Sequence, residues 1–249
     1  FTYKKYSSLG AYKDMSRGKV VIVEGIIGAG KSSFSKELAY ELGNSTLYLQ
    51  EPDEKDNANP YLTNFYEKPA RWAYTMQTHL LQARYKMHLH AQWHAMTTGQ
   101  DAVLDRSYFG DTAFARLQLA MGDMTNDEFN TYQSIYHAMT ASVLLPNVCV
   151  HLNVDPEVAQ QRINKRMQEQ TGRSCENAID IQYLKDLKVE EEKVVKALES
   201  QGVRILTLDW NEDRSDPILR QDTIRGIASY IQEYQPPGDM FLDLHRRTI

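Results

Sequence analysis

The sequence predicts an α/β fold in which a five-stranded parallel sheet is covered by helices on both faces. Short apolar runs alternate with longer amphipathic segments along the chain, as expected for repeated strand–helix–strand units. The first run, Val20 to Val23, has four consecutive β-branched residues, which is typical of a strand buried on both faces. Residues suited to binding phosphate or metal follow several of these runs, where parallel sheets place their ligands. A chain of 249 residues fits one such domain with a single core.

Each expected strand is an apolar run bounded by polar or turn-forming residues. Leu47-Tyr48-Leu49 is short and leads into Glu51, and Val103-Leu104 leads into Asp105. The strands are expected at residues 20–23, 47–49, 103–104, 148–152 and 203–208.

The expected helices combine apolar residues at helical spacing with residues that begin or end helices. Asp155-Pro156 and Asp216-Pro217 each supply an N-cap and a first-turn proline, and Thr125 with Glu128 resembles a capping box. Glycines mark the ends of three other helices. The helices are expected at 34–42, 61–67, 70–98, from after Ser107 to about 121, at 125–144, 155–167, 180–200 and 216–234.

The segment from Gly25 to Ser32 matches the phosphate-binding motif G-x-x-x-x-G-K-[ST]. Glycines let the backbone curl so that its N–H groups point at phosphate oxygens, and the following helix adds the positive end of its dipole. A glycine-rich turn without a ligand is the alternative, but the flanking strand and helix are the context that the motif requires. The sequence therefore predicts a nucleoside-triphosphate site made by Gly25, Gly28, Ala29, Gly30, Lys31, Ser32 and Ser33.

Composition excludes several other classes of function. The formal net charge of −5 gives no electrostatic footprint for a nucleic-acid polymer or an anionic membrane. No apolar run approaches the roughly 20 residues of a membrane span. Cys149 lies in an apolar run and Cys175 in a polar segment, without the spacing of a disulfide framework or a zinc site. We expect a protein of a reducing compartment, the cytoplasm or the mitochondrial matrix.

Several motifs occur in a fixed order between Lys19 and Ile231. They are the P-loop, Glu51-Pro52, 65–69 (Phe-Tyr-Glu-Lys-Pro), Gln77 with Arg84, Asp105-Arg106-Ser107, Asp111, Gly172-Arg173-Ser174 with Glu176, 206–209 (Leu-Thr-Leu-Asp) and 211–213 (Asn-Glu-Asp). Together they resemble the deoxyribonucleoside kinase family, nearest to its deoxyadenosine, deoxyguanosine and deoxycytidine branch. The resemblance implies a P-loop kinase fold with a kinase domain over 19–235 and a lid at about 162–179, ATP and Mg²⁺ as cofactors, and a homodimer packed through the helices at about 70–98 and 125–144.

The segments on either side of this domain are expected from their composition. An excess of lysine and arginine predicts a basic arm over 1–18, with the remnant of a transit peptide as the alternative. Pro236-Pro237-Gly238 predicts a separate tail over 236–249.

The resemblance assigns the chemistry to Glu51, Arg106 and Lys31. Glu51 is expected to be the general base for the deoxyribose 5′-hydroxyl, a task that suits a carboxylate because phosphoryl transfer needs mainly positioning. Arg106 would hold Glu51 and contact the transferred phosphate, while Ser32 and Asp105 would hold Mg²⁺. Asp105 is one methylene shorter than the glutamate that the family more often carries there. The structural alternatives are a strand-end acid for Glu51 and a buried salt bridge between Asp105 and Arg106.

Further residues resemble the family's ATP-binding lid. Arg162, Arg166 and Arg173 match the arginines that close on the ATP phosphates, although the segment before Arg173 is about five residues longer than the family pattern. Arg162 and Arg166 share a helix face, so an ordinary solvated surface is the alternative for them. Glu212 and Asp213 belong to a loop that resembles the one holding adenine through backbone groups.

Other residues resemble the family's nucleoside site. Tyr66 and Glu176 are expected at the sugar 3′-hydroxyl, and Gln77, Arg84 and Asp111 at the base. The Gln77 amide offers a donor and an acceptor, which match an adenine-like or cytosine-like edge. A polar stripe on an interfacial helix is the alternative for Gln77 and Arg84.

The expected activity is phosphorylation of the 5′-hydroxyl of a deoxyribonucleoside for dNTP salvage. Ala115 stands where relatives usually carry an aromatic residue, with Phe114 beside it; a wider pocket there favours deoxyadenosine or deoxyguanosine, with deoxycytidine next. A nucleoside monophosphate kinase is a second possibility, but it would need extra cations for the acceptor's phosphate. A third is a non-catalytic accessory subunit of respiratory complex I, which the intact Lys31, Glu51 and Arg106 disfavour.

Overall fold

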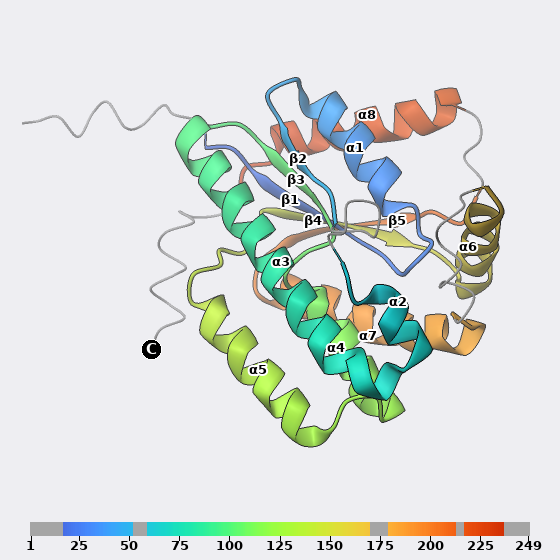
Figure 1. Ribbon diagram of the computed structural model, residues 1–249. Coiled ribbons are helices and arrows are strands. Elements are labelled where there is room, and N and C mark those ends of the chain that lie inside the picture. The colour runs from blue at the N-terminus through green and yellow to red at the C-terminus, as the bar shows by residue number, and fades with distance from the viewer. Residues whose placement is uncertain (1–16, 52–58, 170–178, 213–216, 237–249) are drawn as a thin grey trace, which may run out of the picture.

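The computed structural model describes residues 17–51, 59–169, 179–212 and 217–236 (Figure 1). The expected basic arm, apart from its last two residues, and all but the first residue of the expected tail lie outside these ranges. Within them, strands and helices alternate as predicted. No helix of this part of the chain is long and apolar enough to cross a membrane.

Five parallel strands form one sheet, which confirms the predicted fold class. They are β1 (Val20–Glu24), β2 (Leu47–Leu49), β3 (Ala102–Asp105), β4 (Val148–Asn153) and β5 (Arg204–Asp209). Their order across the sheet is β2-β3-β1-β4-β5. β1 and β3 are buried at every residue because helices cover both faces, which explains why their sequences are apolar without alternation.

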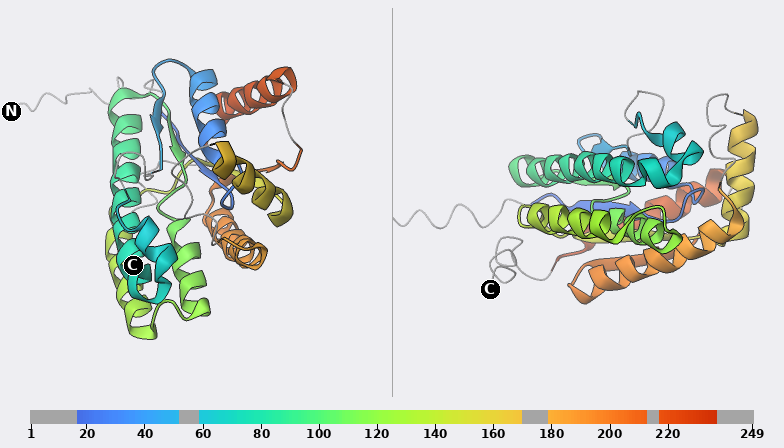
Figure 2. Two further views of the ribbon diagram at one scale, coloured as in Figure 1. Left: turned by 45° about the vertical axis from the view of Figure 1, so that its right-hand side comes forward. Right: turned by 60° about the horizontal axis from the view of Figure 1, so that its bottom comes forward.

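Two layers of helices enclose the sheet (Figures 1 and 2). The helices are α1 (Lys31–Leu42), α2 (Leu62–Glu67), α3 (Pro69–Thr98), α4 (Asp111–Met121), α5 (Asn126–Thr140), α6 (Pro156–Glu169), α7 (Ile181–Ser200) and α8 (Pro217–Glu233). α1 and α8 pack together on one face, and α3, α4, α5 and α7 lie on the other. α3 and α5 run side by side in both figures and are in contact.

The strand order brings three loops together at one edge of the sheet. β1 pairs with β3, and β3 pairs with β2, so the carboxyl ends of these strands are neighbours. The phosphate-binding loop follows β1, Glu51 follows β2 and Arg106 follows β3. Ligands of parallel sheets bind at this edge, so the fold itself assembles the candidate site.

The helix that begins after Thr125 is shorter than predicted. The capping box at Thr125 is present, but α5 ends at Thr140 rather than near residue 144. The backbone at Leu144 is instead fixed to α3: its N–H donates to Gln92 Oε1 at 3.0 Å, and its carbonyl lies 2.8 Å from His88 Nε2. These side chains satisfy the backbone groups of Leu144 outside a helix, which local sequence patterns do not reveal.

Candidate active site

The loop between β1 and α1 has the backbone geometry of a phosphate-binding loop. Gly28 and Gly30 have φ of 82° and 90°, in the left-handed region that residues with a side chain rarely adopt. Space excludes a side chain at Gly28 as well, because its Cβ would lie 2.5 Å from the Ala159 carbonyl oxygen. α1 begins at Lys31, so the first-turn N–H groups, which lack partners within the helix, follow the loop directly. All the predicted phosphate-binding residues from Gly25 to Ser33 belong to this loop or to the first turn.

Lys31 lies buried at the start of α1. Its ammonium group donates a hydrogen bond to the Ile26 carbonyl oxygen at 3.0 Å. Burial, with the positive charge of Arg106, lowers the pKa of Lys31 to about 8, although the carboxylates of Glu51 and Asp105 partly oppose this. A desolvated cation at a helix N-terminus is suited to bind an anion strongly.

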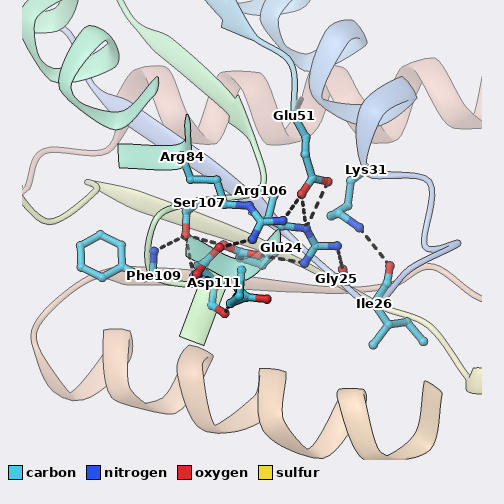
Figure 3. Close-up of polar contacts among 12 residues, drawn as sticks. Glu24, Gly25, Ile26, Lys31, Glu51, Arg84, Arg106, Ser107, Phe109 and Asp111 are labelled. Atoms are coloured by element: carbon cyan, nitrogen blue, oxygen red, sulfur yellow. Dashed lines mark hydrogen bonds and ion pairs between the residues drawn. The ribbon is translucent and has the colours of Figure 1, made fainter. Parts of the chain in front are cut away.

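Glu51 lies between two guanidinium groups (Figure 3). Arg84 of α3 donates to Oε1 through Nη2, and Arg106 donates to Oε2 through Nε at 3.2 Å. Burial alone would raise the pKa of Glu51, but the charges of Arg106, Arg84 and Lys31 outweigh burial and lower this pKa to about 2. The side chain keeps 25% of its surface exposed, so an ionised carboxylate is held in place within reach of a ligand.

Arg106 connects Glu51 to the phosphate-binding loop. Its φ is 66°, and it is the one non-glycine residue with positive φ in the described part of the chain. Its Nη2 donates to the Gly25 carbonyl at 3.3 Å, and Nη1 lies 3.9 Å from the Glu24 carboxylate. Backbone strain of this kind persists where surrounding contacts impose it, and it is common at functional sites.

Asp111, the first residue of α4, joins the residues predicted to recognise a base. Arg84 Nη1 donates to Oδ1, while Gln77 Nε2 and the Tyr132 hydroxyl donate to Oδ2 at 2.8 and 2.5 Å. Gln118 donates to the Gln77 amide oxygen at 3.1 Å, and Gln77 Nε2 also donates to the Asp111 carbonyl at 3.1 Å. The structure thus brings Gln77, Arg84 and Asp111 together, but a base must replace one of these bonds to pair with Gln77.

Phe114 supports the two arginines that hold Glu51. The Arg106 and Arg84 guanidinium carbons lie 4.7 and 5.5 Å from the centre of its ring. Such cation–π contacts help to hold both arginines in place. Ala115 beside it is fully buried. Tyr66 is half-buried on α2 and is one of the residues that pack against the core.

Asp105 has the features expected of a Mg²⁺ ligand. Both of its carboxylate oxygens are buried, and neither has a hydrogen-bond partner among the described residues. Burial and the nearby negative charge of Glu51 raise the pKa of Asp105, while the charges of Lys31 and Arg106 oppose this rise. In the described chain, no group of three or more His, Cys, Asp or Glu side chains could hold a metal ion. One carboxylate and one hydroxyl suit Mg²⁺ that arrives with substrate phosphates, because this ion keeps most of its other ligands as water or phosphate oxygens.

Arg162 of α6 binds backbone carbonyls on two loops. Its Nη1 donates to the Ala29 carbonyl at 3.3 Å, and Nη2 donates to those of Trp210, Asn211 and Glu212 at 2.8, 3.2 and 3.2 Å. It therefore ties the phosphate-binding loop to the loop after β5. Glu212 contributes its backbone to this contact while its side chain is exposed, and the predicted role of that loop at adenine stays a prediction.

Four of the predicted site residues take no part in the contacts described above. Arg166 is half-buried one turn beyond Arg162, on a helix that extends to Glu169 and so into the segment expected to be the lid loop. Arg173, Glu176 and Asp213 lie outside the described residues, so their roles stay predictions.

Two buried carboxylates near the site were not predicted. Glu24, at the end of β1, accepts a hydrogen bond from the Ser107 hydroxyl, which itself accepts from the N–H groups of Phe109 and Gly110 at 3.1 Å. Glu191 of α7 is 3% exposed, and burial raises the pKa of its carboxyl to about 7. One signal in the sequence could have identified both carboxylates. Glu24 ends an apolar strand run, and Glu191 stands at a helix position where the spacing of apolar residues requires another apolar residue.

Comparison with known proteins gives a family and a fold. The family model described as deoxynucleoside kinase matches residues 21–232. The chain is 35% identical to a deoxyguanosine kinase of Dictyostelium discoideum over 193 residues, which cover 78% of this chain and 64% of that relative. It is 30% identical to a deoxyadenosine/deoxycytidine kinase of Bacillus subtilis (strain 168) over 222 residues, which cover 88% of this chain and 96% of the relative.

The fold is also similar to solved structures. The structure of deoxyadenosine kinase from M. mycoides with bound dATP superposes with a TM-score of 0.68 at 23% identity, covering 85% of this chain and 99% of the other. At this level of identity, the likeness concerns the fold alone.

Proposed function

Because the chain belongs to the deoxynucleoside kinase family, we propose that it transfers the γ-phosphate of ATP to the 5′-hydroxyl of a purine deoxyribonucleoside. Deoxyadenosine or deoxyguanosine is the preferred substrate, with deoxycytidine next, in a dNTP salvage reaction. The proposal includes Mg²⁺ as cofactor and a homodimer packed through α3 and α5. Trp93, which is 59% exposed on α3, supports the use of that helix as an interface.

One observation carries the proposal: an ionised carboxylate is fixed beside a phosphate-binding loop. Glu51 is held by Arg84 and Arg106, and its charge and that of Lys31 stabilise each other. A nucleoside hydroxyl at Glu51 and a terminal phosphate at Lys31 would therefore be close enough to react. Positioning of this kind is the main contribution of a protein to phosphoryl transfer.

The residues then take complementary roles. Glu51 accepts the proton of the 5′-hydroxyl as the oxygen attacks the γ-phosphate, and Lys31 and the first-turn N–H groups of α1 hold the phosphates. Arg106 keeps Glu51 oriented and adds positive charge near the transferred group. Mg²⁺ bound through Ser32 and Asp105 would supply further neutralisation of the phosphate charge.

The relatives support the purine preference. The two relatives described above are named for deoxyguanosine and for deoxyadenosine and deoxycytidine. Gln77 and Asp111 together offer an amide and a carboxylate for a purine edge once a base replaces one of their mutual hydrogen bonds. The same names favour a nucleoside kinase over the two alternatives, a nucleoside monophosphate kinase and an accessory subunit of complex I.

The proposal is tested by supplying ATP, Mg²⁺ and each of the four deoxynucleosides in turn. We expect 5′-monophosphate from deoxyadenosine or deoxyguanosine with the highest kcat/KM, a lower value for deoxycytidine and the lowest for thymidine. A preference for thymidine would contradict the base assignment. No monophosphate from any of the four, or phosphorylation of dAMP in preference to deoxyadenosine, would reject the activity.

The Lys31 environment leads to a pH prediction. Because burial lowers the pKa of Lys31 to about 8, its phosphate-binding charge is complete below that pH and is lost as the pH rises through it. We therefore expect kcat/KM for ATP, which reports the free enzyme, to fall above about pH 8. The fall in kcat at saturating ATP should begin at a higher pH, because bound phosphate favours the charged ammonium. A kcat/KM for ATP that stays level up to the ordinary pKa of lysine would contradict this.

A further inference from the structure

The side-chain amide of Gln77 is held at both ends. On one side, Nε2 donates to the backbone carbonyl and to the Oδ2 carboxylate oxygen of Asp111, at 3.1 and 2.8 Å. On the other side, Oε1 accepts a hydrogen bond from Gln118 Nε2 at 3.1 Å. All three residues are buried, with no more than 1% of their surface exposed. Both N–H groups and the oxygen of this amide are therefore engaged.

The chemistry of the partners leaves one direction for the amide. A carboxylate and a carbonyl oxygen only accept hydrogen bonds, so the nitrogen of Gln77 must face Asp111. The oxygen of Gln77 then faces Gln118, and of the two ends of the Gln118 amide only the nitrogen can donate to it. Turning the Gln77 amide over would place oxygen against the carboxylate and nitrogen against nitrogen. Asp111 and Gln118, both on α4, thus lock the amide from opposite sides.

Gln118 is an unfavourable residue for folding alone. It lies among buried apolar residues of α4, and its own Oε1 is buried without a hydrogen-bond partner in the described part of the chain. An unpaired buried acceptor costs free energy, which an apolar side chain of the same length would avoid. A polar residue that breaks the local pattern in this way is expected where function requires it. Its bond to Gln77 indicates that the function concerns that amide.

Pairing of Gln77 with a base leaves the bond from Gln118 in place. An amide oxygen has two lone pairs, so Oε1 can accept from a base and from Gln118 at the same time. The nitrogen has to release one of its two bonds to Asp111 and keeps the other. The amide is then still tied on each side, and Gln118 is the tether of its oxygen end.

An amide of fixed direction distinguishes two classes of base. Adenine and cytosine present an exocyclic amino donor beside a ring acceptor, whereas guanine and thymine present a carbonyl acceptor beside a ring N–H donor. The order of donor and acceptor is opposite in the two classes. An amide that can turn over fits either class, but a locked amide leaves the wrong class with unpaired buried groups, and such mismatches are strongly rejected.

We propose that Gln118 is a positioning residue that fixes the direction of the Gln77 amide and so makes the nucleoside site discriminate between deoxyadenosine and deoxyguanosine. It acts through Gln77 and does not touch the reacting atoms. The inference rests on the proposed activity and deepens it, because it names the residue that limits a purine-accepting site to one of the two purines.

The test measures the ratio of kcat/KM for the two purine deoxynucleosides. Both reactions use the same ATP and the same catalytic groups, so effects on the chemistry cancel in this ratio. We expect the original protein to favour one purine by about tenfold or more. Gln118→Met removes the donor and keeps the length of the side chain, and it should reduce the ratio about fivefold to tenfold, the effect of one lost hydrogen bond.

The pattern of the loss distinguishes positioning from a merely structural role. The decrease in kcat/KM should fall on the preferred purine, while KM for ATP stays within about twofold. A structural defect would instead weaken both purines by the same factor and leave the ratio unchanged. Gln221→Met makes the same change at an exposed position of α8, on the other face of the sheet, and should alter neither quantity.

Two further variants complete the comparison. Gln118→Leu removes the same donor and takes the place of the methionine variant if that protein does not fold. In a protein that already carries Gln77→Leu, adding Gln118→Met should change the ratio by less than about twofold, because the amide through which Gln118 acts is absent.

The outcomes separate this inference from the proposed activity. Equal use of both purines by the original protein, an unchanged ratio in Gln118→Met, or the same change with and without Gln77 would overturn the positioning role even in an active enzyme. If neither purine deoxynucleoside is phosphorylated, the proposed activity fails, and the ratio of their Kd values from equilibrium binding tests the positioning role in the same way. If neither of them binds, both proposals fail.

Discussion

Replacing Glu51 with glutamine should lower kcat by about 10²- to 10⁴-fold, the range expected for loss of a general base. Glutamine has the same shape and can still accept hydrogen bonds from Arg84 and Arg106, but it cannot take a proton from the substrate hydroxyl. The Kd of the deoxynucleoside should stay within a few-fold, because the base-recognition residues around Asp111 are untouched. Single-turnover assays and equilibrium binding with the same preparation would measure both quantities.

The low pKa of Glu51 does not argue against this role. A pKa of about 2 describes the site without substrate, where three cations surround the carboxylate. Phosphate groups at Lys31 would offset part of this positive charge and raise the basicity of Glu51. The loose transition state of phosphoryl transfer also requires little proton removal before the bond to phosphorus forms.

The effect of the Glu51 change should be on chemistry rather than on folding. Arg84 keeps its contact with Asp111, and Arg106 keeps the Gly25 carbonyl, so neither guanidinium is left without a partner. Glu233→Gln, at an exposed position in the last turn of α8, is a matched control and should leave kcat unchanged. An unchanged kcat in Glu51→Gln would remove this residue from the mechanism.

Replacing Lys31 with methionine should lower kcat about 10²- to 10³-fold, the usual cost of losing one group that stabilises transition-state charge. It should also weaken ATP binding. The ammonium group is buried, so its attraction for phosphate is less screened by water than that of a surface lysine. Initial rates over a range of ATP concentrations, at a fixed saturating deoxynucleoside, would separate kcat from KM.

Methionine keeps the length of the aliphatic stem, so the change tests the charge rather than the packing. Because the buried ammonium has a lowered pKa, its removal should not reduce the melting temperature. Lys36→Met on the exposed side of the same helix is the matched control. Equal kinetics for the two lysine variants would show that Lys31 does not contact the phosphates.

Local patterns were sufficient to predict the strands, most helix limits and the phosphate-binding loop. The loop depends on glycines at positions where φ is positive, and the strands depend on runs of apolar residues; both are properties of a few neighbouring residues. The end of α5 was predicted wrongly because it depends on Gln92 and His88, which lie some fifty residues away in the sequence.

The candidate site was predicted as a set of residues but not as a set of contacts. The contact between Glu51 and Arg106 was expected, whereas the hydrogen bond that Arg84 donates to Glu51 was not. Gln77 was expected to be available to a base, yet its amide is bonded to Asp111 and Gln118. Arg162 binds four backbone carbonyls, which was not predicted, and its expected contact with the ATP phosphates stays a prediction.

The sequence by itself determined the fold class, the position of the phosphate-binding loop and the family, because each follows from residue types at short, fixed spacings. Only the tertiary structure decided which charges neutralise one another and which carboxylates are buried near the site. The physical reason is that hydrogen bonds and ion pairs act over a few ångströms, and the partners here come from different strands and helices. Their distances are set by how β1, β2, β3 and α7 pack, which no local pattern encodes.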